Sequence, residues 1–118
     1  MRTLPAAILG LAFAAGCTTF PRPDARVASS EGAIRGAQEV GAQKVPQASL
    51  HLKLAQEERA KALDFMRTGE YQRAEYMLMR SEADAELANA MAREVQAKRD
   101  AEQASERLEA LKSKVGGK

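Results

Sequence analysis

The chain has few of the residues that usually build compact cores and reactive sites. Its 118 residues include a single cysteine, a single histidine and no tryptophan, and only 4% of them are aromatic. A single cysteine excludes a disulfide within the chain. Alanine is the commonest apolar residue, and it favours helix while burying little area. The composition therefore predicts helices around a thin core.

Neither sign of charge dominates. Without the first 16 residues, which contain Arg2 but no acidic residue, 17 basic residues face 16 acidic ones. A nucleic-acid-binding protein has a basic patch or stripe, so this balance argues against that class.

Motifs of enzyme active sites are also missing. The sequence contains no glycine-rich phosphate loop, no nucleophile elbow and no H-E-x-x-H pattern. His51 has no carboxylate or cysteine three or four residues away, which predicts a partly exposed surface histidine rather than a metal ligand or general base. We expect no enzyme activity, no cofactor, no metal and no small-molecule substrate.

Two further groups could suggest a metal site. Four methionines are better explained as core filler, because their flexible side chains fill irregular gaps. Three acidic residues at alternate positions do not share one helical face, which favours a solvated surface over a cation site. These residues are Met66, Met77, Met79 and Met91, and Glu82, Asp84 and Glu86.

No apolar run is long enough for a permanent membrane span. The longest, residues 4–15, follows the basic Arg2 and falls short of the roughly 20 residues that a spanning helix needs. A short apolar run after a basic start, ending in small residues, is typical of a signal peptide. We predict that residues 1–16 are removed.

The cysteine comes directly after this run. The sequence Ala14-Ala15-Gly16-Cys17 resembles the bacterial lipobox, although Ala14 stands where leucine is usual. The resemblance implies a diacylglycerol and an N-acyl chain on Cys17, and we prefer it to an unmodified cysteine after an ordinary signal. Thr18 stands where lipoproteins kept in the inner membrane have aspartate, so the resemblance implies the outer membrane, periplasmic face.

Three helices are expected after the cysteine. Pro21 and Pro23 predict a flexible tether over residues 17–28. Asp24 or Ser30 can cap a first short helix that ends near Val40, with Gly41 as its stop. A loop over residues 41–46 then leads to a second helix over residues 47–67.

A short turn follows, in which Gly69 ends one helix and Tyr71 packs the corner. Such a turn makes neighbouring helices antiparallel. The third helix is expected from about Glu70 to Gly116, with two apolar stripes out of phase. The first stripe, which we expect to pack on the second helix, comprises Ala74, Leu78, Ser81, Ala85, Ala88, Ala92 and Val95.

The second stripe is expected to project beyond the hairpin. It comprises Ala97, Ala101, Ala104, Leu108, Leu111 and Val115. At this spacing it predicts an interaction face, centred on Leu108, Leu111 and Val115, for a second copy or an envelope protein. The terminal Lys118 follows two glycines and is a candidate for a covalent link to peptidoglycan.

This layout resembles the small bacterial lipoproteins of domain-of-unknown-function family 4398. The matching residues are Gly69, Tyr71 and Ala74, followed by the run of residues 81–88, S-E-A-D-A-E-L-A. The resemblance spans roughly residues 29–111 and implies place and architecture, since the family has no assigned activity.

The expected fold is all-α: a short N-terminal helix and an antiparallel helical hairpin with a long C-terminal helix, over residues 29–118. The expected function is that of a lipid-anchored envelope protein with a structural or protein-interaction role. The alternatives are a soluble periplasmic chaperone or carrier, and a peptidoglycan tether through Lys118.

Overall fold

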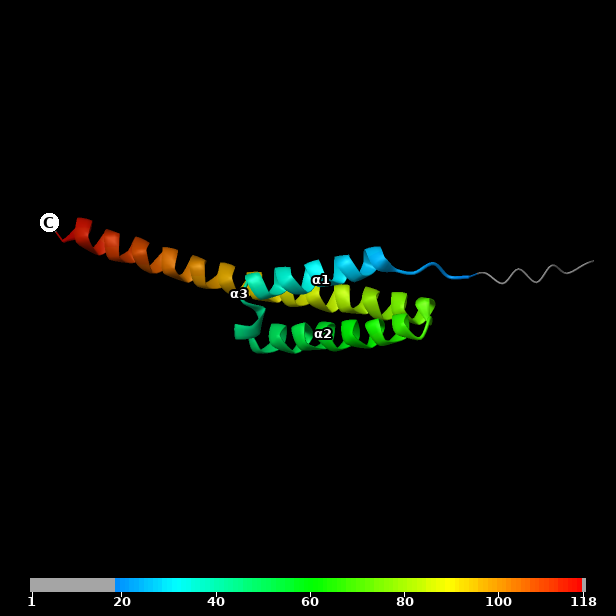
Figure 1. Ribbon diagram of the computed structural model, residues 1–118. Coiled ribbons are helices and arrows are strands. Elements are labelled where there is room, and N and C mark those ends of the chain that lie inside the picture. Colours follow the sequence, from blue (N-terminus) through cyan, green and yellow to red (C-terminus); the bar gives the residue numbers. More distant parts are fainter. Residues whose placement is uncertain (1–18, 118) are drawn as a thin grey trace, which may run out of the picture.

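Three α-helices make up the fold, as the sequence predicts. The computed structural model describes residues 19–117. They form α1 (Asp24–Glu39), the single 3₁₀ turn η1 (Ala42–Lys44), α2 (Pro46–Arg67) and α3 (Tyr71–Gly116), with no strand among the described residues. In Figure 1, α2 and the first half of α3 form an antiparallel hairpin and α1 lies along α3. The 46 residues of α3 give it a length of about 69 Å at 1.5 Å per residue.

The first helix begins earlier than the predicted tether allows. The predicted tether covers residues 17–28, but α1 begins at Asp24, the earlier of the two predicted starts, so residues 24–28 are helical. Two contacts account for this. Pro23 accepts a backbone hydrogen bond from Val27 at 3.1 Å, and Val27 packs against the buried cluster at that end of the hairpin. Apolar packing thus holds the first turn.

Glycines end both of the first two helices at the expected places. Gly41 and Gly69 have φ angles of 78° and 77°, in the left-handed region that side chains with a Cβ rarely adopt. The predicted loop over residues 41–46 contains η1, and Pro46 rather than Gln47 is the first residue of α2. Proline suits this position because the first helical N–H has no partner within the helix.

Small side chains bring α2 and α3 close together. The predicted stripe of α3 is buried from Ala74 to Ala92. Alanines of α2 face it, and the Ser81 hydroxyl donates a 2.7 Å hydrogen bond to the Ala55 carbonyl of α2. A side chain as short as serine reaches a neighbouring backbone only where two helices approach closely. The buried alanines of this interface are Ala48, Ala55 and Ala62 of α2, and Ala74, Ala85, Ala88 and Ala92 of α3.

A polar layer interrupts the alanine interface near its middle. Glu58 of α2 is only 5% exposed. Its Oε1 forms an ion pair with Nη2 of Arg80 of α3, at a distance of 2.8 Å. Its Oε2 is buried without a hydrogen-bond partner. Burial, and secondarily the nearby Asp84 carboxylate, raise the pKa of Glu58 above its ordinary value of 4.5, although Arg80 opposes the shift. The native fold therefore carries a buried carboxyl group that is only partly paired.

Ion pairs hold α1 against the hairpin. Arg26 contacts the carboxylates of Glu75 and Glu82 of α3, each at 3.0 Å, and Glu31 pairs with Arg59 of α2 at 2.8 Å. A Cβ added at Gly36 would lie 3.4 Å from the Asn89 side chain of α3, so glycine allows a close approach at that point. All three helices are thereby joined.

The alanine interface predicts a steep cost for added volume. We expect Ala85→Leu to lower the free energy of unfolding by about 1–3 kcal/mol, because the larger side chain must push the helices apart. Chemical denaturation of the purified protein measures this change. Ala83→Leu makes the same substitution at an exposed position of α3 and should stay within about 0.5 kcal/mol of wild type. Equal effects of the two variants would contradict close packing at Ala85.

Glu58 predicts a pH dependence of stability. A carboxyl whose pKa is raised in the folded state binds its proton more tightly there than in the unfolded chain. Its contribution to the free energy of unfolding therefore decreases as pH rises above the ordinary value of 4.5 and through the raised pKa of the folded state. Glu58→Gln removes this titration, so wild type should lose stability relative to the variant over that range. Denaturation at several pH values measures the difference. Glu57→Gln, which changes an exposed neighbour, is the control, and an identical trend with both variants would be evidence against the effect of burial.

Candidate interaction surface

The projecting segment is the part of α3 that no other helix covers. The buried stripe ends at Ala92, Val95 is half-buried, and residues 96–117 are all exposed. In Figure 1 this part, drawn in orange and red, extends alone from the end of the hairpin. We use the name "projecting segment" for residues 96–117 below.

The predicted interaction face lies on this segment. Leu108, Leu111 and Val115 are 57%, 59% and 78% exposed. Their spacing of three and four residues places them on one side of a helix. Large apolar side chains presented together on one helical face are suited to contact another apolar surface, and hydrogen-bonding groups for a small molecule are not gathered there.

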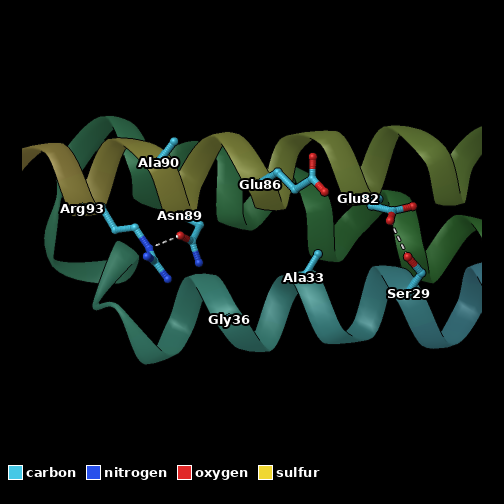
Figure 2. Close-up of a pocket in the computed structure, with 8 residues that line it drawn as sticks. All are labelled: Ser29, Ala33, Gly36, Glu82, Glu86, Asn89, Ala90 and Arg93. Carbon is cyan, nitrogen blue, oxygen red and sulfur yellow. Dashed lines mark hydrogen bonds between the residues drawn. The ribbon is translucent and has the colours of Figure 1, made fainter.

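A groove between α1 and α3 is a second candidate, with a volume of about 540 Å³. Figure 2 shows that α1 contributes small residues to it and that α3 contributes longer polar ones together with Ala90. Four of the polar side chains in this groove are already paired: Ser29 donates a hydrogen bond to Glu82, and Arg93 donates one to Asn89 at 2.7 Å. The remaining lining residues are Ala33, Gly36, Glu86 and Ala90.

A smaller groove of about 400 Å³ lies between α2 and α3. The Arg73 guanidinium stacks over the Phe65 ring at 4.1 Å from its centroid, and Arg73 also pairs with Glu70. One cationic and one apolar side chain of this groove are thus engaged with each other and with a neighbour of the same chain. Its other lining residues are Glu58, Lys61, Tyr76, Met77 and Arg80.

The structure gives His51 a partner that helical spacing could not predict. Its Nδ1 lies 2.7 Å from Oδ1 of Asp84, and both side chains are half-buried, so His51 is partly exposed as predicted. The partner comes from α3, 33 residues away, so only the hairpin brings the two together. Among residues 19–117, no three histidine, cysteine, aspartate or glutamate side chains are grouped to hold a metal ion.

The acidic residues and methionines have separate environments. Glu82 faces Arg26, while Asp84 faces His51. Met66 is buried, whereas Met79 is 44% exposed and is not core filler. Met77 and Met91 pack against the buried clusters.

Glu58 is a buried charged residue that the apolar pattern does not predict. It lies three residues after Ala55 and four before Ala62, both in the buried stripe, and that spacing is the signal that could have identified it.

Two predicted sites fall outside the described part of the chain. Cys17 and Lys118 precede and follow residues 19–117, so the lipid anchor and the wall link stay predictions. Within residues 19–117, no helix combines the length and the apolar character that crossing a bilayer requires.

Comparison with known proteins identifies a structural neighbour. The fold is similar to the 2.47 Å crystal structure of a DUF4398 family protein (PA2901) from Pseudomonas aeruginosa PAO1, with a TM-score of 0.75 and 29% sequence identity. The match covers 81% of this chain and 97% of the other. No family model and no curated protein matches the sequence. The structural match confirms the resemblance of this chain to domain-of-unknown-function family 4398.

Proposed function

We propose that this protein is a lipid-anchored protein of the bacterial outer membrane, periplasmic face, whose projecting segment binds a protein partner. Lipid on Cys17 would fix one end of the chain. Asp24, where α1 begins, follows Cys17 by seven positions, and seven residues reach at most about 25 Å. The helical domain would therefore stay close to the membrane surface.

The observation that carries the proposal is the position of the two ends of the domain. The start of α1 lies beside the α2–α3 turn, and the projecting segment leaves from the opposite end (Figure 1). Arg22, Leu63 and Arg67 line one shallow pocket at the turn, which places the chain just before α1 at that end. An anchor at Cys17 would thus hold the exposed apolar face on the side of the domain away from the lipid.

The alternative of a soluble carrier has less support. A carrier of apolar cargo needs an apolar cavity that encloses most of its ligand. Both grooves between the helices are open, and charged side chains line each of them. Attachment to peptidoglycan through Lys118 remains compatible with the proposal, because Lys118 follows the end of the projecting segment in the sequence.

Lipidation predicts a specific effect of removing the thiol. We expect Cys17→Ser to leave an uncleaved precursor without lipid, because serine lacks the sulfur that receives the diacylglycerol. Membrane fractionation and intact-mass measurement detect both changes. Thr18→Ser is an equally conservative change beside the cysteine and should be processed normally. A C17S protein that is cleaved and fractionated like wild type would contradict the anchor.

If the apolar face binds a partner, adding charged residues to it should weaken that binding. We expect the double variant Leu108→Lys and Leu111→Lys to lose crosslinked products in intact cells, since a buried lysine without a partner is costly. Crosslinking followed by mass spectrometry compares the products. Ala110→Lys with Ser113→Lys adds the same charges to the other side of the segment and should retain them. Unchanged products in the first variant would exclude this face.

A further inference from the structure

Basic residues border the apolar face of the projecting segment on both sides, and acidic residues lie on the opposite side of the helix. At 100° per residue, Arg107 and Lys114 fall along one edge of the stripe, and Lys98 and Lys112 fall along the other. Asp100 is the acidic residue of these borders. The opposite side of the helix carries Glu102, Glu106 and Glu109.

Three of the border cations are available for a partner. Lys98 already pairs with Glu94 at 2.6 Å, and Asp100 accepts a 2.8 Å hydrogen bond from Gln96. Within residues 19–117, Arg107, Lys112 and Lys114 take part in no ion pair. A surface that covers the stripe would bring its own charges against these cations.

A second copy of this chain fits the borders poorly. Border residues of paired helices face one another across the apolar seam. In a parallel pair in register, Arg107 of each copy would face Lys112 of the other. The same like-charge contact occurs on both sides of such a pair.

The antiparallel pairing has a similar conflict. Matching Ala104 with Leu108 aligns small residues with large ones. Arg107 then meets Arg107 of the other copy, and Lys98 meets Lys112 twice. The attractive contact, between Asp100 and Lys114, also occurs twice, so three like-charge contacts stand against two opposite-charge ones. Like charges outnumber opposite charges in both arrangements, and repulsion of this kind selects against self-pairing.

We infer that the projecting segment binds a helix of a different protein, whose own apolar stripe is bordered by aspartate or glutamate. A helix suits the site because Ala97, Ala101 and Ala104 allow close approach of a second backbone. A membrane surface suits it less, since residues 96–117 contain no aromatic residue and only three large apolar ones on the face. This inference deepens the proposed function and rests on it for the role of the segment in partner binding.

Two synthetic helical peptides test the inference on the purified full-length mature protein. Both carry leucine at every core position of about three heptads. The border positions are all glutamate in one peptide and all lysine in the other. We expect the acidic peptide to bind about tenfold more tightly, or more, in fluorescence anisotropy, because it replaces several repulsive contacts by attractive ones. Added salt should reduce the difference.

Charge reversal provides the matched comparison. The double variant Arg107→Glu and Lys112→Glu should prefer the basic peptide. Arg99→Glu reverses a cation on the back of the same segment and should keep the wild-type preference. Circular dichroism checks that the helix content of each variant is unchanged, so a lost preference cannot be attributed to unfolding.

Each outcome decides. A preference for the acidic peptide that reverses in the double variant supports the inference. Equal binding of both peptides, binding of neither, or tighter binding to vesicles of equal parts phosphatidylglycerol and phosphatidylcholine would overturn it. The peptides act without the lipid, so this failure is distinct from failure of the anchor, which C17S tests, and of partner contact in cells, which L108K/L111K tests.

Discussion

The close approach of α2 and α3 is the constraint on which the rest of the structure depends. Because the buried positions are mostly alanine, each contributes little apolar area, and the interface gains stability only if the helices lie nearly in contact. The hydrogen bond from Ser81 to the Ala55 carbonyl requires that short separation. Alanine also leaves the individual helices intrinsically stable, so a thin core is enough to fold this chain.

An interface of nearly identical small residues does not by itself select one register, since a shift by one heptad would again place alanine on alanine. Polar groups that meet at a single position remove this ambiguity. His51 contacts Asp84, and Glu58 contacts Arg80, only when the two helices are aligned as observed. The buried Oε2 of Glu58 makes this layer costly in stability. Specification of register at such a cost is known for polar residues in helical seams.

The sequence predicts local structure here better than contacts between helices. Glycine turns, helix lengths and the buried stripe of α3 follow from periodicity and from backbone conformations that favour glycine, and both act within a few residues. Of the two predicted starts of α1, Asp24 and Ser30, the structure has the earlier one, because Val27 packs against residues far along the chain. Likewise, the partner of His51 is invisible to an analysis of neighbours three or four residues away, since the hairpin alone brings Asp84 to it.

The projecting segment follows from a change of phase within one continuous helix. The stripe of the first half ends at Val95 and that of the second begins at Ala97, so the later apolar face could not follow the earlier one along α2 even if α2 were longer. Without tertiary packing, the segment depends on its own helix formers and on pairs such as Glu94 with Lys98. Its apolar side chains therefore contribute little to the stability of the isolated chain. Because folding does not require this face, its residues can be selected for binding instead. The charges along its borders therefore indicate the kind of partner that it binds.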